Sequence, residues 1–211
     1  MKKPVLVLLC MSLWSHHANA GPSTELKVRG VIKPAACALT FANGGTVDVG
    51  VISKHLLNAE RRTLLHDEKV NFTIACDAPT RVSLDLTDHR SGTAAAKASA
   101  KPPSFLFGLG QVDGKNVGAY TLSFDEPPLA DQKTMRLVTA DNQVDWMRSH
   151  SFLLPNRRHS WTIHDNNNTP TAFSSMTGVI VLAPAIAPAK DLPTMDEIAL
   201  DGLASFELNY P

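Results

Sequence analysis

The sequence predicts an all-β fold, a single β-sandwich with one disulfide bond, and three observations lead to this prediction. Short apolar stretches with a period of two recur along the chain, which is typical of strands with one buried face and one exposed face. Turn residues separate these stretches at short intervals. Two cysteines, Cys37 and Cys76, remain once an N-terminal export signal is set aside.

The beginning of the chain has the pattern of a secretory signal peptide. Two lysines precede an apolar run, and small residues end the segment. Cleavage is predicted between Ala20 and Gly21, so residues 1–20 are the signal peptide and residues 21–211 form one domain. Cys10 lies inside the apolar run rather than after it, so no lipid anchor is expected.

The charge of the mature chain is nearly balanced. Removal of the signal leaves 18 basic and 20 acidic residues of the 20 and 20 in the full sequence. A nearly neutral surface gives no reason to expect nucleic acid or an anionic membrane as a partner. No later stretch has the apolar length of a transmembrane helix, so no membrane anchor is expected.

The expected elements follow one another along the chain as short strands and turns. Pro184 suggests an edge or a bulge in the last long run. In order, they are a first strand at 26–32, an apolar run at 37–41, a turn at 43–45, a short strand at 46–51, a loop or weak helix at 55–68, a hairpin of strands 70–76 and 82–86, an exposed loop at 91–103, a hairpin of 105–111 and 119–124 around a turn at 113–116, weaker strands at 135–139 and 161–164, and a β-rich run at 176–187.

The last fourteen residues, 198–211, alternate between apolar or small side chains and polar ones. Burial of a large side chain such as Leu200 or Phe206 would contribute roughly 1.5–3 kcal/mol, so this segment must pair with something. Two interpretations stay open. It is the last strand of an ordinary closed sandwich, or it is a strand whose outer edge a partner completes.

The two mature cysteines favour a disulfide. An even number of cysteines in an exported chain is typical of paired thiols. A loop of ~40 residues closed in this way would stabilise the fold by about 4 kcal/mol on the chain-entropy model. The alternative is two unpaired buried thiols.

No constellation of residues indicates catalysis, a metal site or a cofactor. The six mature histidines show no metal-binding spacing, and no nucleophile elbow or phosphate-binding loop is present. Arg157, Arg158 and Trp161 are better explained as a charged turn leading into a core strand than as a ligand site. We therefore expect no enzyme, although the sequence alone leaves a hydrolase as a distant third interpretation.

Several segments together resemble chaperone–usher fimbrial subunits, and more closely a β-fimbrial-subunit-like family of unknown function in Gram-negative bacteria. A glycine seven residues before the first cysteine, a second cysteine that ends an alternating strand and a penultimate tyrosine are shared with pilins. The matching segments are 28–37, the strand ending at Cys76, the hairpin from 107–110 through 118–120, the run 185–188, and the closing stretch 201–210.

This resemblance implies an immunoglobulin-like, pilin-type sandwich that lacks its final strand. Ala204, Phe206, Leu208 and Tyr210 would line one wall of an open groove. The Cys37–Cys76 bond would join the first strand to the strand that carries the second cysteine. The implied partners are a periplasmic chaperone, an usher and other fimbrial subunits, and the implied location is the periplasm or a cell-surface fimbrium. A strand added from a partner would cover the exposed core and satisfy the unpaired edge.

The sequence differs from pilins in the segment before the first strand. Only residues 21–24 precede it, whereas pilins carry a donor extension of about a dozen residues. We therefore expect a chain that accepts a strand without donating one, as a minor or tip component. The receptor of such a component is not indicated.

Two alternatives remain. The chain could complete its own sandwich and stay outside any fibre. It could also be a self-contained secreted module that binds carbohydrate or another ligand near Trp146, Trp161 and residues 166–168. The sheet edge beside residues 198–210 separates these interpretations.

Overall fold

The computed structural model describes residues 27–29, 36–141, 145–163, 168–193 and 197–210. The chain divides into two compact units, Met1–Lys33 and Pro34–Pro211. In the first unit, residues 27–29 are exposed and form no strand or helix. The predicted signal peptide and the rest of the predicted strand at 26–32 lie outside the described residues. The strands described below all belong to the second unit.

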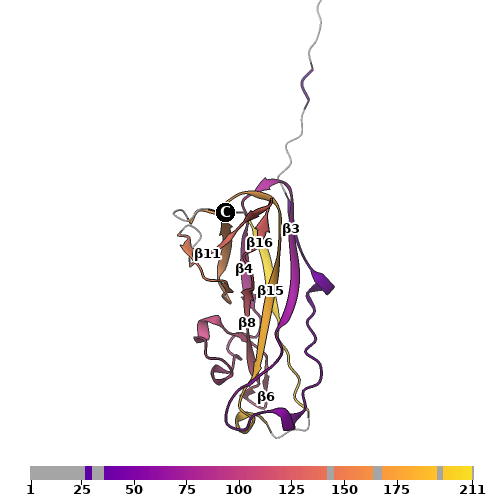
Figure 1. Cartoon of the computed structure of the whole chain (residues 1–211), viewed down its shortest axis with the longest axis vertical. Helices are drawn as coiled ribbons and strands as arrows, with labels where there is room; N and C mark the ends of the chain where they lie inside the picture. Colours follow the sequence, from indigo (N-terminus) through magenta and orange to yellow (C-terminus); the bar gives the residue numbers. More distant parts are fainter. Residues whose placement is uncertain (1–26, 30–35, 142–144, 164–167, 194–196, 211) are drawn as a thin grey trace, which may run out of the picture. The chain divides into compact units, whose positions relative to one another are not determined.

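The larger sheet contains nine of the described strands, and its pairings are antiparallel (Figure 1). Its main path, in spatial order, is β1 (Cys37–Phe41), β3 (Glu68–Thr80), β15 (Phe173–Ile186), β8 (Gly118–Phe124) and β13 (Phe152–Leu153). Three short strands pair along this path: β2 (Thr63–Leu64), β5 (Phe107–Gly108) and β9 (Leu129–Ala130). A fourth, β10 (Lys133–Thr134), pairs with β9. The first strand, β1, is therefore one edge of this sheet.

The second sheet is also antiparallel and ends at the C-terminal strand. Its order is β12 (Met147–Arg148), β11 (Arg136–Ala140), β14 (Arg158–Thr162), β4 (Ser83–Asp88) and β16 (Ala204–Asn209). A separate ladder joins β6 (Gln111–Val112) and β7 (Lys115–Asn116). The described 3₁₀ helices are η1 (Ala42–Gly45), η2 (Lys54–Leu56), η3 (Ala96–Ala98), η4 (Pro103–Phe105) and η5 (Ala189–Asp191).

The two large sheets pack against each other because alternate residues of their strands are apolar. In β3, Phe72 and Ile74 are buried, and in β4, Leu86 is buried from the other layer. Trp161 of the second sheet packs edge to face on Phe173 of the first, with ring centroids 6.4 Å apart. These contacts belong to one continuous core. The predicted all-β sandwich is confirmed.

The predicted hairpin of 105–111 and 119–124 is confirmed. The β6–β7 turn has Asp113 and Gly114 at its centre, with φ of 49° and 73°. Asp-Gly is favoured at such turns because both central residues have positive φ. Further along the same hairpin, Phe107 of β5 lies opposite Tyr120 of β8, and their rings stack with centroids 5.1 Å apart.

The predicted hairpin of 70–76 with 82–86 is wrong, although both strands form. β3 pairs with β1 and β15 in the larger sheet, whereas β4 pairs with β14 and β16 in the second. Their apolar residues enter the core from opposite layers, so the short connection at 81–82 crosses from one sheet to the other. Alternation alone does not distinguish a hairpin from such a crossing.

Two predicted strand segments do not form ladders. The segment at 46–51 belongs to no strand. Its first residue, Thr46, is extended, with φ/ψ of −86°/129°, but Gly50 has a φ of 70°, which interrupts the extended backbone. The predicted C-terminal strand begins only at Ala204, since β4 ends opposite it at Asp88. Both segments lack a neighbouring strand in the described chain. These two segments lie on either side of the site described below.

Pro184 lies inside the larger sheet, not at the edge or bulge that the sequence suggests. It is opposite Tyr120 on β8, and its carbonyl accepts a hydrogen bond from Leu65 beside β2. Because hydrogen-bonded pairs alternate along an antiparallel ladder, its missing N–H faces the short strand β2. The ladder with β8 therefore loses no donor.

The remaining predicted elements agree with the structure in part. The predicted strands at 135–139 and 161–164 correspond to β11 and β14, and β14 starts earlier, at Arg158. The region 55–68 contains η2 and β2. The loop at 91–103 is not wholly exposed, because Ala95 and Ala98 pack into the core.

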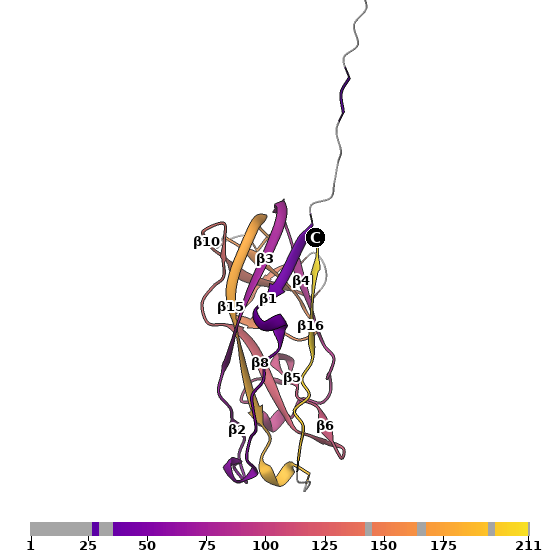
Figure 2. The same ribbon diagram turned by 90° about the vertical axis from the view of Figure 1, so that its right-hand side faces the viewer.

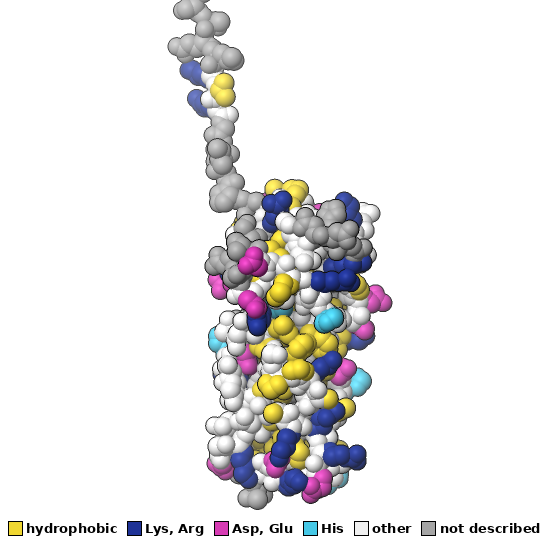
Figure 3. Space-filling view, turned by 90° about the vertical axis from the view of Figure 1, so that its left-hand side faces the viewer, with side chains coloured by type: hydrophobic (Ala, Val, Ile, Leu, Met, Phe, Trp, Pro, Cys, Tyr) yellow, Lys and Arg dark blue, Asp and Glu magenta, His cyan; other side chains and the backbone are white. Residues whose placement is uncertain are grey.

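The other edge of the larger sheet, at β13, carries a half-buried aromatic contact. Phe152 meets Phe105 edge to face with centroids 5.4 Å apart, and Lys101 Nζ lies 4.4 Å from the Phe152 ring centroid. On the side of the molecule opposite to that of Figure 2, apolar side chains gather between lysines and arginines (Figure 3).

Candidate partner-strand groove

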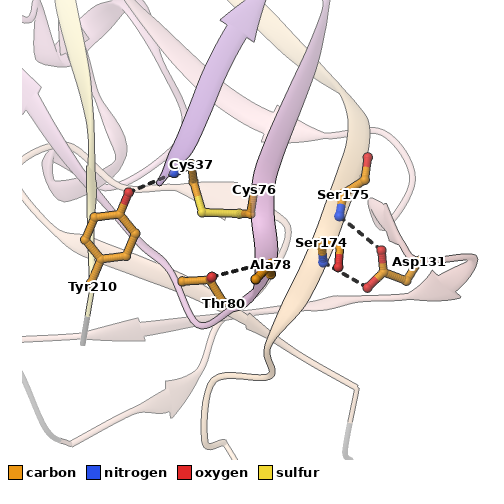
Figure 4. The surroundings of a disulfide bond; sticks show 8 residues. All are labelled: Cys37, Cys76, Ala78, Thr80, Asp131, Ser174, Ser175 and Tyr210. Atoms are coloured by element: carbon orange, nitrogen blue, oxygen red, sulfur yellow. Dashed lines mark hydrogen bonds between the residues drawn. A yellow bond between two sulfur atoms is a disulfide. The ribbon is translucent and has the colours of Figure 1, made fainter. Parts of the chain in front are cut away.

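The predicted disulfide joins Cys37 and Cys76 (Figure 4). The two residues lie directly opposite each other in the β1–β3 ladder. The bond therefore ties the edge strand β1 to the next strand of its sheet. The alternative of two unpaired thiols is wrong.

The edges of the two sheets meet at this end of the sandwich. The Cys37 backbone N–H donates a hydrogen bond of 2.9 Å to the Tyr210 hydroxyl oxygen (Figure 4). Further along, Phe41 of β1 meets Phe206 of β16 edge to face, with ring centroids 5.0 Å apart. These four residues, Cys37, Phe41, Phe206 and Tyr210, are called the clasp below. They connect two sheet edges that share no ladder.

The facing edges carry backbone groups that no strand pairs, and of these the Cys37 N–H bonds the Tyr210 hydroxyl. Asp77 N–H bonds Ala36 O beside β1, and His89 N–H bonds Leu203 O beside β16. Because hydrogen-bonded pairs alternate in antiparallel ladders, every second residue of each strand directs its N–H and C=O away from its partner strand. These outward residues are Cys37, Leu39 and Phe41 in β1, and Ala204, Phe206 and Leu208 in β16.

Beyond the clasp an apolar cavity of about 780 Å³ lies next to both edges. The chain that continues from β1 and the chain that leads into β16 extend below these strands, with β8 and β15 behind them (Figure 2). Residues from both segments line the cavity. Its floor consists of core-facing side chains of the larger sheet, namely Val70, Tyr120, Leu122, Ile180 and Leu182. This part of the sheet has no strand of the second sheet among its lining residues except the start of β16.

The first wall is the segment 46–52. Val47 and Val49 are half-buried and line the cavity. The backbone groups of Val47, Val49 and Val51 have no hydrogen-bond partner among the described residues, whereas Gly50 N–H bonds the Asp48 side chain. Gly50 has a φ of 70°, so the segment contains a turn and leaves its apolar side chains at the cavity without forming a continuous strand.

The second wall is the segment 197–203, and hydrogen bonds with neighbouring parts of the chain hold it in place. Arg90 forms a two-pronged ion pair with Asp201, at 2.9 Å from Nε and 2.8 Å from the terminal nitrogen. The Asp201 N–H also bonds Leu109 O at 3.0 Å. The hydrogen bond from Arg90 holds the pKa of the Asp201 carboxyl below its usual value. This wall is therefore attached to the turn that follows β4 and to Leu109 beside β5.

Gly202 brings the second wall close to the floor. A Cβ atom here would lie 3.0 Å from the Tyr120 ring and 3.1 Å from the Leu109 side chain. Burial is the main cause that raises the pKa of Tyr120, so its hydroxyl stays protonated. A larger residue at this position would have to displace the wall or the tyrosine ring.

The residues predicted for the groove are divided between the cavity and the clasp. Ala204 and Phe206 line the cavity, and Phe206 also belongs to the clasp. Leu208 is half-buried and packs against the core, and Tyr210 bonds Cys37. The predicted cleavage residues, Ala20 and Gly21, lie outside the described residues.

Sequence reasoning missed the first wall and the floor. The alternation of Val47, Val49 and Val51 predicted a strand, but nothing in it indicated a strand without neighbours. The floor residue Tyr120 was noted only as part of a hairpin. Tyr120 lies at a cavity because the second sheet does not extend over it. The sequence of one strand does not show how far the opposite sheet extends.

The residues of the alternative ligand site are described only in part. Trp161 is buried in the core against Phe173, and Trp146 is half-buried beside β12. Asn168 is described, whereas residues 166–167 are not. Nor do the described residues bring together three or more His, Cys, Asp or Glu side chains that could hold a metal ion. In the same part of the chain, no helix has the length and apolar character needed to span a membrane.

The fold and site define an all-β sandwich with a strand-sized apolar groove beside its C-terminal strand. Residues 26–121 match the model of a family described as a protein of unknown function, DUF1120. The chain is also similar to the uncharacterized protein YhcF of Escherichia coli (strain K12), with 23% identity over 239 aligned residues that cover the whole of both chains.

Proposed function

We propose that this protein is a structural, pilin-like subunit whose sandwich is completed by an extended strand from a partner. The observation that carries the proposal is the apolar groove of about 780 Å³ between two segments that lack strand neighbours. An added strand would bond the free backbone groups and cover the aliphatic floor at the same time. The partners would be a periplasmic chaperone, an usher and other fimbrial subunits.

The resemblance described above supports the same proposal and its location in the periplasm or in a surface fimbrium. An exported chain meets no cytosolic reductant, which suits the Cys37–Cys76 bond. The short segment before the first strand suits a subunit that accepts a strand without donating one, and hence a minor or tip position. No catalytic role is part of the proposal.

The test compares two adjacent positions on β16. Ala204 lines the groove, whereas Ser205 is exposed on the other face of the strand. Ala204→Asp places a carboxylate in the apolar wall, where an unpaired charge is strongly unfavourable. Ser205→Asp adds the same charge one residue away and serves as the matched control.

The probe is a synthetic peptide of alternating isoleucine and threonine, added to the folded protein during thermal unfolding. Binding to the native state raises the unfolding midpoint in a concentration-dependent way. We expect this rise for the wild type and for Ser205→Asp, and its loss for Ala204→Asp. A wild-type midpoint that does not respond to the alternating peptide would contradict the proposal, as would an equal response in all three proteins. A peptide of the same composition without alternation is the control for nonspecific binding.

A further inference from the structure

We propose that Arg90 is a positioning residue that keeps the groove open. It holds Asp201 and thereby prevents the second wall, 197–203, from moving over the floor and completing the sandwich from within. This inference rests on the proposed function, because a groove that the chain itself closes could not be completed by a partner. It adds the residue that maintains the open state.

Arg90 contacts Asp201 through several atoms. Its Nε donates to the Asp201 carboxylate at 2.9 Å and to the Asp201 carbonyl oxygen at 3.1 Å. Its Nη2 donates to the second carboxylate oxygen at 2.8 Å. A planar guanidinium that bonds a carboxylate through two nitrogens fixes the direction of the contact as well as its distance. Arg90 therefore determines where this part of the second wall lies.

Arg90 is itself held by a buried carboxylate. Asp88, which is 5% exposed, accepts one hydrogen bond from the Arg90 backbone N–H at 2.9 Å and another from the Gly108 N–H of β5 at 3.0 Å. A Cβ atom on Gly108 would clash with the Arg90 carbonyl oxygen, so a glycine is needed for this close approach. Gly110 likewise leaves room for Asp201, since a Cβ atom here would lie 3.3 Å from the Asp201 Cβ atom. The turn that carries Arg90 is thus fixed to the larger sheet.

The apolar side chains of the second wall favour its movement toward the floor. The wall is anchored at its end, because β16 begins at Ala204. Ile198 and Leu200 line the cavity but are only half-buried, and Leu203 is 49% exposed. Movement over the aliphatic floor would remove more of this apolar surface from water, which is favourable. The ion pair at Asp201 opposes that movement.

The experiment measures access to the floor through the rate at which a cysteine in the full mature chain reacts with N-ethylmaleimide. Leu182→Cys places a thiol on the floor, where Leu182 lines the cavity and is half-buried. The two native cysteines of the mature chain are joined to each other and do not react. We expect the folded Leu182→Cys protein to be labelled, and the addition of Arg90→Ala to lower the rate severalfold. The Asp201 N–H still bonds Leu109 O in this variant, so labelling is expected to slow and not to stop.

The matched control is Arg158→Ala, which removes the arginine of a second two-pronged pair, with Asp85, outside the cavity lining. This variant should leave the labelling of Leu182→Cys unchanged. An equal or faster rate with Arg90→Ala, or an equal decrease in both variants, would overturn the role of Arg90 and leave the proposed function standing. No labelling of Leu182→Cys alone would show that the floor is covered, and would overturn the open groove on which the proposed function depends. Arg90→Lys, which keeps the charge but lacks the planar fork, replaces Arg90→Ala if the alanine variant does not fold.

Discussion

The Tyr210 hydroxyl oxygen accepts a hydrogen bond of 2.9 Å from the Cys37 backbone N–H, although the two residues are 173 positions apart. The last described residue of the chain is thereby attached to the first residue of β1, next to the disulfide. Since β1 and β16 belong to different sheets, this bond joins the two layers at one end. It also holds the C-terminal strand β16 next to the β1 edge, and the groove lies beyond this contact.

Tyr210→Phe tests this contact. The variant keeps the ring and loses the acceptor, so the Cys37 N–H has to bond water instead. Because Tyr210 is 53% exposed, we expect a loss of about 0.5–1 kcal/mol in the free energy of unfolding, near the lower end for hydrogen bonds. Urea unfolding of the wild type and the variant measures this loss. An unchanged free energy would mean that the bond does not stabilise the fold.

Removal of the disulfide should have a larger effect. The bond closes a loop with a sequence separation of 39. For a loop of this length the chain-entropy model gives a stabilisation of about 4 kcal/mol. We expect the double variant Cys37→Ala with Cys76→Ala to lose stability of this order in urea unfolding under non-reducing conditions.

The wild type treated with a reductant is the companion measurement for the disulfide. It should lose stability in the same direction, while the double variant should be indifferent to the reductant. A wild type whose unfolding is the same with and without reductant would contradict the prediction.

Export and processing form a third prediction. Cleavage after Ala20 should leave a mature chain that begins at Gly21. N-terminal sequencing of protein from the periplasmic fraction measures this directly. Ala20→Arg, which removes the small residue before the cleavage position, should give unprocessed protein. A mature chain that begins elsewhere, or a lipid on Cys10, would be inconsistent with this assignment.

How much of this molecule could be predicted depended on whether the signal was local. The Asp113–Gly114 turn and the strand alternation around Ile74 are local signals, and the structure contains both. The disulfide follows from the number of cysteines in an exported chain, which leaves one possible pair. The assignment of β3 and β4 to different sheets is not local. Both strands alternate in the same way, and only packing against distant strands decides which layer each one joins.

The groove likewise depends on contacts between distant parts of the chain, which local alternation does not reveal. The alternation is regular at 46–51 and is broken by Leu203 at 198–203, so the sequence predicted ladders in both segments. A ladder requires a partner strand, and neither segment has one among the described residues. The missing neighbour is a property of the whole fold, and only the three-dimensional arrangement reveals that two such segments flank one cavity.

The last prediction concerns His159, which is fully buried in β14. Its Nε2 lies 3.0 Å from the Leu154 backbone nitrogen, and its Nδ1 has no hydrogen-bond partner in the described chain. Burial lowers the pKa of His159 from 6.5 to about 4, because the charged form would lose its hydration. The folded protein therefore holds this imidazole neutral at pH values where the unfolded chain already protonates it.

Between pH 6.5 and 4 the unfolded state consequently binds more protons at this position than the folded state. The contribution of His159 to the free energy of unfolding is constant above about pH 6.5 and falls as the pH drops toward 4, by up to ~1.4 kcal/mol per pH unit. Urea unfolding across this range should show a shallower pH dependence for His159→Gln than for the wild type. His89→Gln, which changes an exposed histidine, should keep the wild-type slope. Equal slopes in the wild type and His159→Gln would show that the buried imidazole does not titrate on unfolding.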